Sequence, residues 1–278
     1  MMENRRTKKY SRDGEHATIV VEAEESYLSD AQDFQVKLAT NRALIEAAAN
    51  FDELKDLVSR FRRGSFRHDF EGELNEVSAK LDSDELIMSG HQVMQAWERE
   101  LMNRMVRLML EEQRVLPGET AGLNVLEVGF GMGISATEIM RHSPASYTVL
   151  EPNPDVIESW DKWKDGRENV RLIQGYWQDV ISDLGEFDAI FYDPYVYFDE
   201  GREYEPMIEF FPVAAQHLKP GGSLVYFTCE IDSVGRPHQR ELFKYFRRFS
   251  SEVVEGLVPP EGCQYWWSDR MAIVSALK

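Results

Sequence analysis

The sequence predicts an α/β protein with a doubly wound, mostly parallel sheet, preceded by an N-terminal helical extension. From Leu123 onward, short apolar runs alternate with helical stretches, which is the pattern of strand, helix, strand repetition. The first of these runs ends in a glycine-rich turn that opens a helix. With 278 residues and 43% hydrophobic content, the chain can bury the core of such a domain and still carry an extension.

The N-terminal part of the chain differs from the rest. Residues 1 to about 28 are polar, charged and aperiodic, as in a tail without a packed core. Apolar residues then recur at steps of three and four over 33–62, which predicts an amphipathic helix. A second long helix is expected over 92–112, with one apolar face formed by Val93, Met94, Trp97, Leu101, Met105 and Leu108. We therefore expect an extension over 1–85 and one domain over 86–278.

Short apolar runs are predicted to form the strands of the sheet. They are expected at 124–130, 146–152, 170–175, 187–193 and 222–228, with a last pair near 253–260 and 271–278. Parallel strands that are buried on both faces read as continuous apolar runs, as these do. Ligands of such sheets bind beyond the carboxyl ends of the strands, and Asp193 stands at one such end.

Composition excludes several classes of protein. The 31 Lys+Arg against 49 Asp+Glu give a formal net charge of -18, which would repel a phosphate backbone, so no nucleic-acid partner is expected. Cys229 and Cys263 are too few for a disulfide framework or a cysteine-rich zinc site, and the six histidines show no ligand spacing. No run of about 18 apolar residues and no apolar signal region occur. We expect a soluble, cytoplasmic protein without a metal or a membrane partner.

The stretch EVGFGMG places Gly129, Gly131 and Gly133 between a strand and a helix that is expected to begin at about Ile134. Glycines remove Cβ atoms where the chain turns sharply and where a ligand touches the backbone, and a helix start offers free N–H groups. Glu151 ends the next strand, where a carboxylate can accept both ribose hydroxyls. The combination predicts a nucleoside ligand; the glycines alone would also suit a simple tight turn.

Two classes of nucleotide compete for this turn. Dinucleotides favour G-x-G-x-x-G, whereas the spacing here is G-x-G-x-G with Glu127 just before it. A carboxylate at that place suits the ammonium and sulfonium of S-adenosylmethionine better than a pyrophosphate, so both spacing and charge favour S-adenosylmethionine. At the end of the third strand, Trp177 would lie against the adenine and Gln178 or Asp179 would meet its amine, with an ordinary core position as the alternative for Trp177.

Six stretches together resemble one family of methyltransferases. They are VMQAWERELM (93–102), VLEVGFGMG (125–133), GYWQDV (175–180), FYDPY (191–195), LKPGGSLVYF (218–227) and LVPPEGCQYWW (257–267). They resemble guanidinoacetate N-methyltransferase and its relatives that methylate arginine guanidino groups, over roughly Leu86 to Lys278. The glycine-rich strand is generic to Class I methyltransferases, whereas the W-E pair, the Y-D-x-Y pattern and the C-terminal stretch are more specific. The resemblance implies a Rossmann-like Class I methyltransferase fold.

The resemblance also implies roles for single residues. Glu98 matches the glutamate that binds the substrate, and Asp193 matches the aspartate that holds the guanidino group beside the reactive methyl. The positions that it implies for S-adenosylmethionine are Met94, Met102, Gly129, Phe130, Gly131, Met132, Glu151 at the ribose, and Trp177 with Gln178 at the adenine. Gln178 replaces the usual glutamate, and FTCEIDSVGR (227–236) differs from the segment that binds the substrate carboxylate. These departures leave the identity of the substrate open.

Paired carboxylates suit a guanidino substrate. A guanidinium is planar, charged and forked, so it pairs with carboxylates that accept two parallel N–H bonds. Its ordinary pKa, above about 12, means that a base must take a proton as the nitrogen is methylated. Asp193, walled by Tyr192, Pro194 and Tyr195, is the candidate base, and Tyr195 is also expected to bind the substrate. A solvated helix acid for Glu98 and an Asx turn for Asp193 are the plainer alternatives.

The substrate and the extension leave alternatives open. Free L-arginine is favoured over guanidinoacetate, with Glu230 or Asp232 as the acid for its α-ammonium. A protein-arginine methyltransferase is an alternative, because the acidic charge would suit a basic partner; a non-catalytic scaffold would have no need of the two acids. The D-P-Y stretch also invites comparison with enzymes that methylate adenine or glutamine, but it has a single proline. The extension is a candidate lid or homodimer surface.

Overall fold

The computed structural model describes residues 9–11, 74–114, 122–195, 207–228, 234–263, 265–266 and 268–278. The helix expected over 33–62 lies outside these residues, as do most of the expected extension, Glu230 and Asp232. None of the helices within the described ranges combines the length and the apolar character needed to cross a bilayer.

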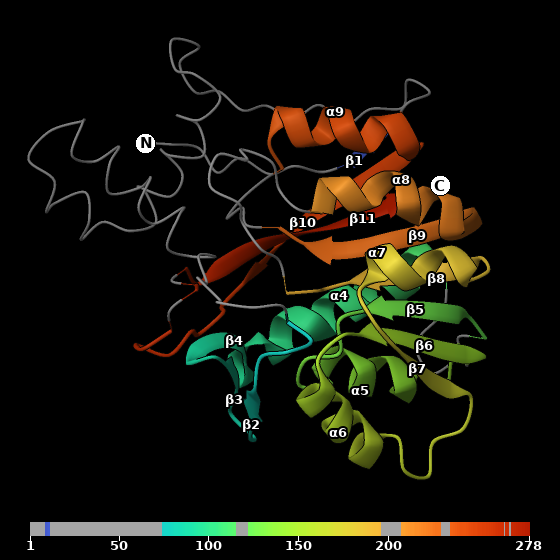
Figure 1. Cartoon of the computed structure of the whole chain (residues 1–278). Helices are drawn as coiled ribbons and strands as arrows, with labels where there is room; N and C mark the ends of the chain where they lie inside the picture. Colours follow the sequence, from blue (N-terminus) through green and yellow to red (C-terminus); the bar gives the residue numbers. More distant parts are fainter. Residues whose placement is uncertain are drawn as a thin grey trace, which may run out of the picture.

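The central sheet joins eight strands of the described chain in the order β1-β10-β11-β9-β8-β5-β6-β7 (Figure 1). Their bounds are β1 (Lys9–Ser11), β5 (Asn124–Val128), β6 (Ser146–Glu151), β7 (Val170–Gln174), β8 (Phe187–Tyr192), β9 (Leu218–Phe227), β10 (Arg248–Glu255) and β11 (Arg270–Leu277). The strands from β7 to β9 pair in parallel, whereas β9, β11, β10 and β1 pair antiparallel. The predicted doubly wound, mostly parallel sheet is confirmed.

Helices cover both faces of this sheet (Figure 1). The helices of the described chain are α4 (Arg99–Glu112), α5 (Ile134–Arg141), α6 (Pro154–Trp163), α7 (Trp177–Val180), α8 (Met207–His217) and α9 (Arg236–Tyr245), with the 3-10 turns η1 (Ala96–Glu98) and η2 (Ile181–Asp183). Residues of α4, α5 and α6 share one buried core, and residues of α8 and α9 share the other. Adjacent strand residues such as Ile190 and Phe191 belong to opposite cores, because successive side chains point to opposite faces.

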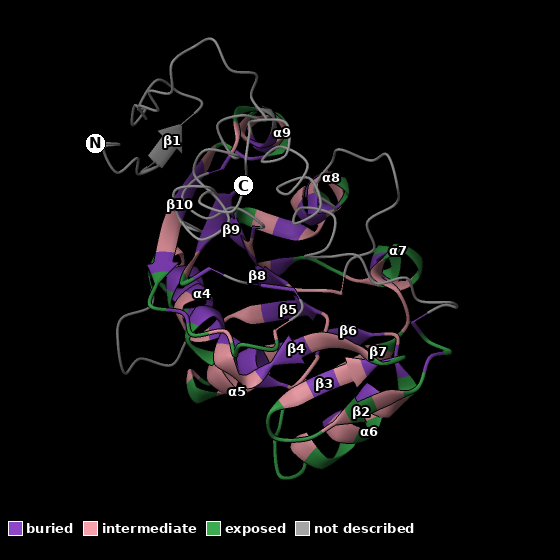
Figure 2. Cartoon of the chain, turned by 90° about the vertical axis from the view of Figure 1, so that its left-hand side faces the viewer, coloured by how far each residue is buried: buried purple, intermediate pink, exposed green. Residues whose placement is uncertain are grey.

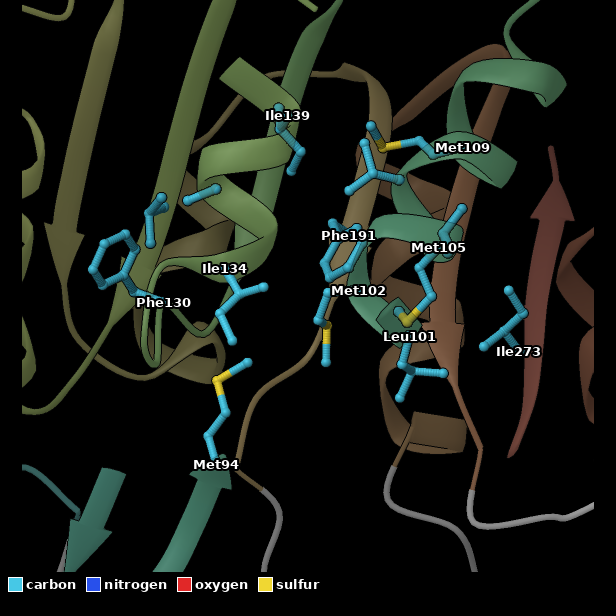
Figure 3. Packing of buried hydrophobic residues seen from close by; sticks show 14 of the residues in the cluster. Met94, Leu101, Met102, Met105, Met109, Phe130, Ile134, Ile139, Phe191 and Ile273 are labelled. Carbon is cyan, nitrogen blue, oxygen red and sulfur yellow. The ribbon is translucent and has the colours of Figure 1, made fainter. Parts of the chain in front are cut away.

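Methionines of α4 fill much of the first core. Met102 and Met105 are fully buried and lie beside Phe191 of β8 (Figure 3). Unbranched, polarisable methionine side chains fill irregular gaps between a helix and a sheet. This packing fixes the start of α4 against the end of β8, immediately before Asp193.

The long helix expected over 92–112 is wrong at its beginning. His91–Gln95 form strand β4, and α4 begins only at Arg99 after the 3-10 turn η1. Gln95 has an extended backbone and forms a capping box with Glu98, whose carboxylate accepts the Gln95 N–H. Pairing with a neighbouring strand overrides the helical periodicity, so Val93 and Met94 belong to a sheet and not to the face of α4.

A second, three-stranded sheet precedes α4 (Figure 2). It consists of β2 (Ala79–Leu81), β3 (Glu85–Met88) and β4, all paired antiparallel. The expected domain boundary between residues 85 and 86 falls inside β3. β2 packs beside α6, so the chain from Ala79 onward is attached to the main domain.

Candidate active site

The glycine turn, residues 129–133, lies between Asp193, which follows β8, and Met94 of β4. Gly129, Gly131 and Gly133 all have positive φ, at 89°, 53° and 66°. A Cβ on Gly129 would collide with the carbonyl oxygen of Asp193 and lie 2.9 Å from Cα of Pro194. A Cβ on Gly131 would lie 2.7 Å from Sδ of Met94. Glycine is therefore required here both by the left-handed backbone and by close approach.

Asp193 comes directly after the last residue of β8 and stays attached to the sheet. Its N–H donates to the carbonyl of Val128 at the end of β5, at 3.0 Å. Burial raises the pKa of its carboxyl well above the ordinary range, and the negative charges of Glu98 and Glu127 raise it further. We call Glu98 and Asp193, the predicted pair of substrate-binding acids, the clamp; the charge of Glu98 is one cause of the raised pKa of Asp193. An acid with a raised pKa is suited to accept a proton near neutral pH.

Glu98 ends the 3-10 turn η1 and is almost fully buried. Its Oε1 accepts the N–H of Gln95 at 2.8 Å and the hydroxyl of Tyr265 at 2.6 Å. Burial raises the pKa of Glu98 to about 7, and these two hydrogen bonds oppose the rise. The side chain is therefore a fixed acid at the site and not the solvated helix acid of the plainer alternative.

Tyr265 is a site residue that the sequence reasoning missed. It reaches Glu98 from 167 positions further along the chain and stacks on Trp97, with ring centroids 6.0 Å apart. Its C-terminal motif carried part of the family resemblance but gave no role for the tyrosine. The hydroxyl orients the carboxylate and favours its ionised form.

Replacing Tyr265 with phenylalanine is expected to lower kcat/KM for the substrate at neutral pH by about tenfold, corresponding to ~1.5 kcal/mol for one hydrogen bond to a charged acceptor. The acidic limb of the pH profile should move to higher pH, because that hydrogen bond lowers the pKa of Glu98. Initial rates across pH check both effects. Tyr245→Phe, on the exposed surface of α9, is the matched control. An unshifted limb in the Tyr265 variant would contradict the assignment.

Glu151 ends β6 and faces the glycine turn. Its Oε2 accepts the N–H of Phe130 at 3.0 Å, and its Oε1 accepts the N–H of Asn153 at 2.9 Å. Gly131 also donates its backbone N–H to this carboxyl, while burial raises the pKa of Glu151. Ionised carboxylate oxygens have further lone pairs, so they can accept ribose hydroxyls as well. The geometry fits the predicted nucleoside site.

Glu127 lies beneath the glycine turn and is fully buried. Ser135 and Tyr147 donate their hydroxyls to its two oxygens. Burial raises the pKa of Glu127 to about 8, with a further contribution from the charge of Glu151. Both oxygens are thus engaged inside the core, and Glu127, when ionised, raises the pKa of Asp193.

Two of the three expected cofactor methionines, Met94 and Met102, are buried on different elements. Met94, the last residue but one of β4, lies against the glycine turn, where its Sδ accepts the N–H of Met132 at 3.4 Å. In Figure 3, Met94 projects from β4 toward Ile134, at the start of α5, while Met102 lies on α4. Met94, Met132 and Gly131 therefore form one contact, and their part in binding the cofactor stays a prediction.

Other predicted site residues occupy different surroundings. The Phe130 ring packs edge-on against Trp160 and Trp163 in the first core. It also packs against Gly133, where an added Cβ would lie 2.7 Å from Cζ of the ring. Trp177 packs edge-on against Phe210, with centroids 5.0 Å apart. This contact matches the alternative of an ordinary core position, and an adenine contact for Trp177 stays a prediction. Among the remaining positions, Gln178 is exposed on α7 and Tyr195 is half-buried beside the first core.

Comparison with known sequences supports the predicted resemblance. A family described as guanidinoacetate N-methyltransferase matches residues 66–278. The chain is 33% identical over 138 residues to protein arginine N-methyltransferase 2 of Debaryomyces hansenii, and 37% identical over 125 residues to the protein of that name from Aspergillus fumigatus. The alignments cover 49% and 43% of this chain but only 31% and 26% of the relatives. The chain therefore matches less than a third of either relative.

Comparison with solved structures supports the fold. Spermidine synthase from Thermotoga maritima superposes with a TM-score of 0.51 over 74% of each chain, at 15% identity. Likeness at this identity concerns the fold alone. The family match over residues 66–278 includes Glu98, the glycine turn, Glu151, Asp193 and Tyr265. The chain belongs to the guanidinoacetate N-methyltransferase family of methyltransferases.

Proposed function

We propose that this protein transfers a methyl group from S-adenosylmethionine to a guanidino nitrogen of arginine, with free L-arginine as the favoured substrate. The observation that carries the proposal is the pair of acids Glu98 and Asp193, the second of which lies against Gly129 of the glycine turn. They come from η1 and from the end of β8, and the charge of one raises the pKa of the other. Two such acids can hold a planar cation that has N–H groups on two sides.

The chemistry assigned to the chain is binding, orientation and proton acceptance. S-adenosylmethionine, when bound, supplies an electrophilic methyl group on its sulfonium. Glu98 accepts N–H bonds from the guanidinium, and Asp193 holds the nitrogen that attacks the methyl carbon. Asp193 would accept the proton that this nitrogen loses when it is methylated, and S-adenosylhomocysteine would be the other product. Alignment of the nitrogen with the methyl carbon supplies much of the acceleration.

The pH dependence of kcat/KM depends on the ionisation of these acids. The profile should rise through about pH 7, where Glu98 ionises, and continue to rise until Asp193 has lost its proton. Below the pKa of each carboxyl, kcat/KM falls by about tenfold per pH unit for that group. Over the same range the free energy of unfolding of the ligand-free protein should fall, because folding raises the pKa of Glu98 and so disfavours its charged form. Initial rates and urea unfolding at matched pH values check both signs. A flat profile would contradict the clamp.

Protein arginine is the second candidate substrate, and the names of the relatives support it. The net charge of -18 would also attract a basic protein. The guanidino group is common to both substrates, so the clamp serves either one. The two substrates differ in the groups on the α-carbon, and these groups determine which one is bound. A free amino acid carries an α-ammonium and a carboxylate there, whereas a peptide carries neutral amides.

The substrate assay uses the purified full chain with S-adenosylmethionine carrying an isotopic label in the methyl group. L-arginine, guanidinoacetate and an arginine-containing peptide are offered separately, and the products are identified by mass spectrometry. Label in L-arginine supports the proposal. Label in the peptide alone would replace free arginine by protein arginine. An absence of label in all three, with cofactor binding retained, would overturn the guanidino proposal.

A further inference from the structure

A turn at residues 74–77, just before β2, is attached to the carboxyl ends of β6 and β7. Leu74 and Val77 are buried in the first core. The backbone N–H of Asn75 donates to the hydroxyl of Tyr176, which lies just beyond β7, at 3.3 Å. This 74–77 turn therefore crosses the same end of the sheet as the predicted nucleoside site.

Asn153 joins the 74–77 turn to α6. It is fully buried, and its Nδ2 donates to the carbonyls of Leu74 and Val77 at 2.7 and 2.9 Å. Its Oδ1 caps α6 by accepting the N–H groups of Asp155 and Val156 at 3.0 and 3.2 Å. Both donors and both lone pairs of the amide are used, which an aspartate or a serine at this place would not reproduce.

The backbone of Asn153 contacts the cofactor acid directly. Its N–H donates to Oε1 of Glu151, while Phe130 donates to Oε2. The carboxylate is thus held from the glycine turn on one side and from the cap of α6 on the other. Because the side chain of Asn153 is fixed by four hydrogen bonds, the backbone N–H that reaches Glu151 is fixed as well.

We propose that Asn153 is a positioning residue for the nucleoside cofactor, which sets the orientation of Glu151 through its attachment to the 74–77 turn. The inference rests on the proposed use of S-adenosylmethionine. The 74–77 turn then contributes to cofactor affinity, because a Glu151 carboxylate that is already oriented toward the ribose loses little conformational freedom when the cofactor binds. Methyl transfer takes place at Asp193 and Glu98 and depends on Asn153 only through the bound cofactor.

The test is the substitution Asn153→Asp, which keeps the helix-capping oxygen but removes both donors to the 74–77 turn. The dissociation constant of S-adenosylhomocysteine, measured by calorimetry, should rise by about tenfold. The KM of S-adenosylmethionine should rise with it, whereas kcat at saturating cofactor should stay near that of the unmodified protein. Thermal unfolding of each variant is recorded in parallel.

Ser146→Ala is the matched control for a purely structural effect. Ser146 begins the same strand, β6, and its hydroxyl donates to Asn124 at 2.8 Å, at the end of the strand away from Glu151. This variant should lose stability without a change in cofactor affinity. Unchanged affinity in Asn153→Asp, together with a lower melting temperature, would overturn the proposal.

A second variant tests the turn from its other attachment. The carboxylate of Asp155 accepts the N–H of Ala79 at 2.7 Å, just after the 74–77 turn. Asp155→Ala removes this attachment of the same segment, and it replaces Asn153→Asp if that variant does not fold. Weaker binding of S-adenosylhomocysteine by Asp155→Ala supports the proposal. Unchanged binding overturns it. Binding of S-adenosylhomocysteine by the unmodified protein without methylation of any guanidino substrate would remove the proposed substrate class and leave the inference on Asn153 standing.

Discussion

Replacing Asp193 with asparagine is expected to lower kcat by about 100- to 10,000-fold, the usual contribution of a general base. The amide keeps the shape of the carboxyl but cannot take the proton of the attacking nitrogen. Cofactor binding should be retained, because the contact with Gly129 is made by the backbone of Asp193. The free energy of unfolding at neutral pH should be equal or higher, since a half-buried acid with a raised pKa is replaced by a neutral group. Single-turnover rates at saturating substrate and cofactor measure the effect.

Asp188→Asn is the control for this experiment. Asp188 lies on the same strand, β8, but near its other end, where Lys219 donates to its carboxylate at 2.8 and 2.9 Å. That variant should lose an ion pair at the surface and keep its turnover. If Asp193→Asn turned over like the unmodified protein, Asp193 would not be the base.

Replacing Glu98 with glutamine is expected to act mainly on substrate affinity. The variant loses one of the two negative charges that hold the guanidinium, and a charge-assisted hydrogen bond of ~1.5–3 kcal/mol corresponds to a rise of roughly 10- to 150-fold in Kd. It should also remove the step near pH 7 from the pH profile, because that step belongs to Glu98. Calorimetric titration with the substrate, in the presence of S-adenosylhomocysteine, measures the loss.

Glu100→Gln provides the comparison for Glu98. Glu100 stands two residues further along, on the exposed surface of the first turn of α4. The same change of charge at that position should leave the affinity unaltered, which separates a direct contact from a general effect of net charge. Equal affinity of the Glu98 variant and the unmodified protein would rule out the clamp.

The fold could be predicted from the sequence because its strands and the glycine turn each have a local sequence pattern. The runs at 124–130, 146–152, 170–175 and 187–193 each overlap an observed strand, and α5 begins at Ile134 as expected. Parallel strands covered on both sides must be apolar along their whole length, so each one is visible by itself. The glycine turn is visible for a similar reason, since its left-handed residues leave little choice of amino acid.

The parts that sequence reasoning missed depend on contacts between distant segments. Val93, Met94 and Trp97 have helical spacing, yet pairing with β3 makes the first two part of a strand. Tyr265 meets Glu98 across 167 positions, and Asn153 meets Leu74 across 79. No local pattern announces either hydrogen bond. Glu98 could be predicted from the sequence because the motif around it resembles that of a known family, whereas Asp193 also stood out by its place at the end of a predicted parallel strand.

The close approach of Gly129 to Asp193 has a consequence for how such enzymes diverge. The Asp193 backbone lies directly against the glycine turn, so the proposed proton acceptor and the proposed binding site of the methyl donor belong to one packed unit. Glu98 lies on a separate element, the short turn η1, where the hydroxyl of Tyr265 donates to its carboxylate. Natural variation in substrate choice should therefore concentrate on the turn η1 and its partner Tyr265, while the glycine turn and Asp193 stay the same.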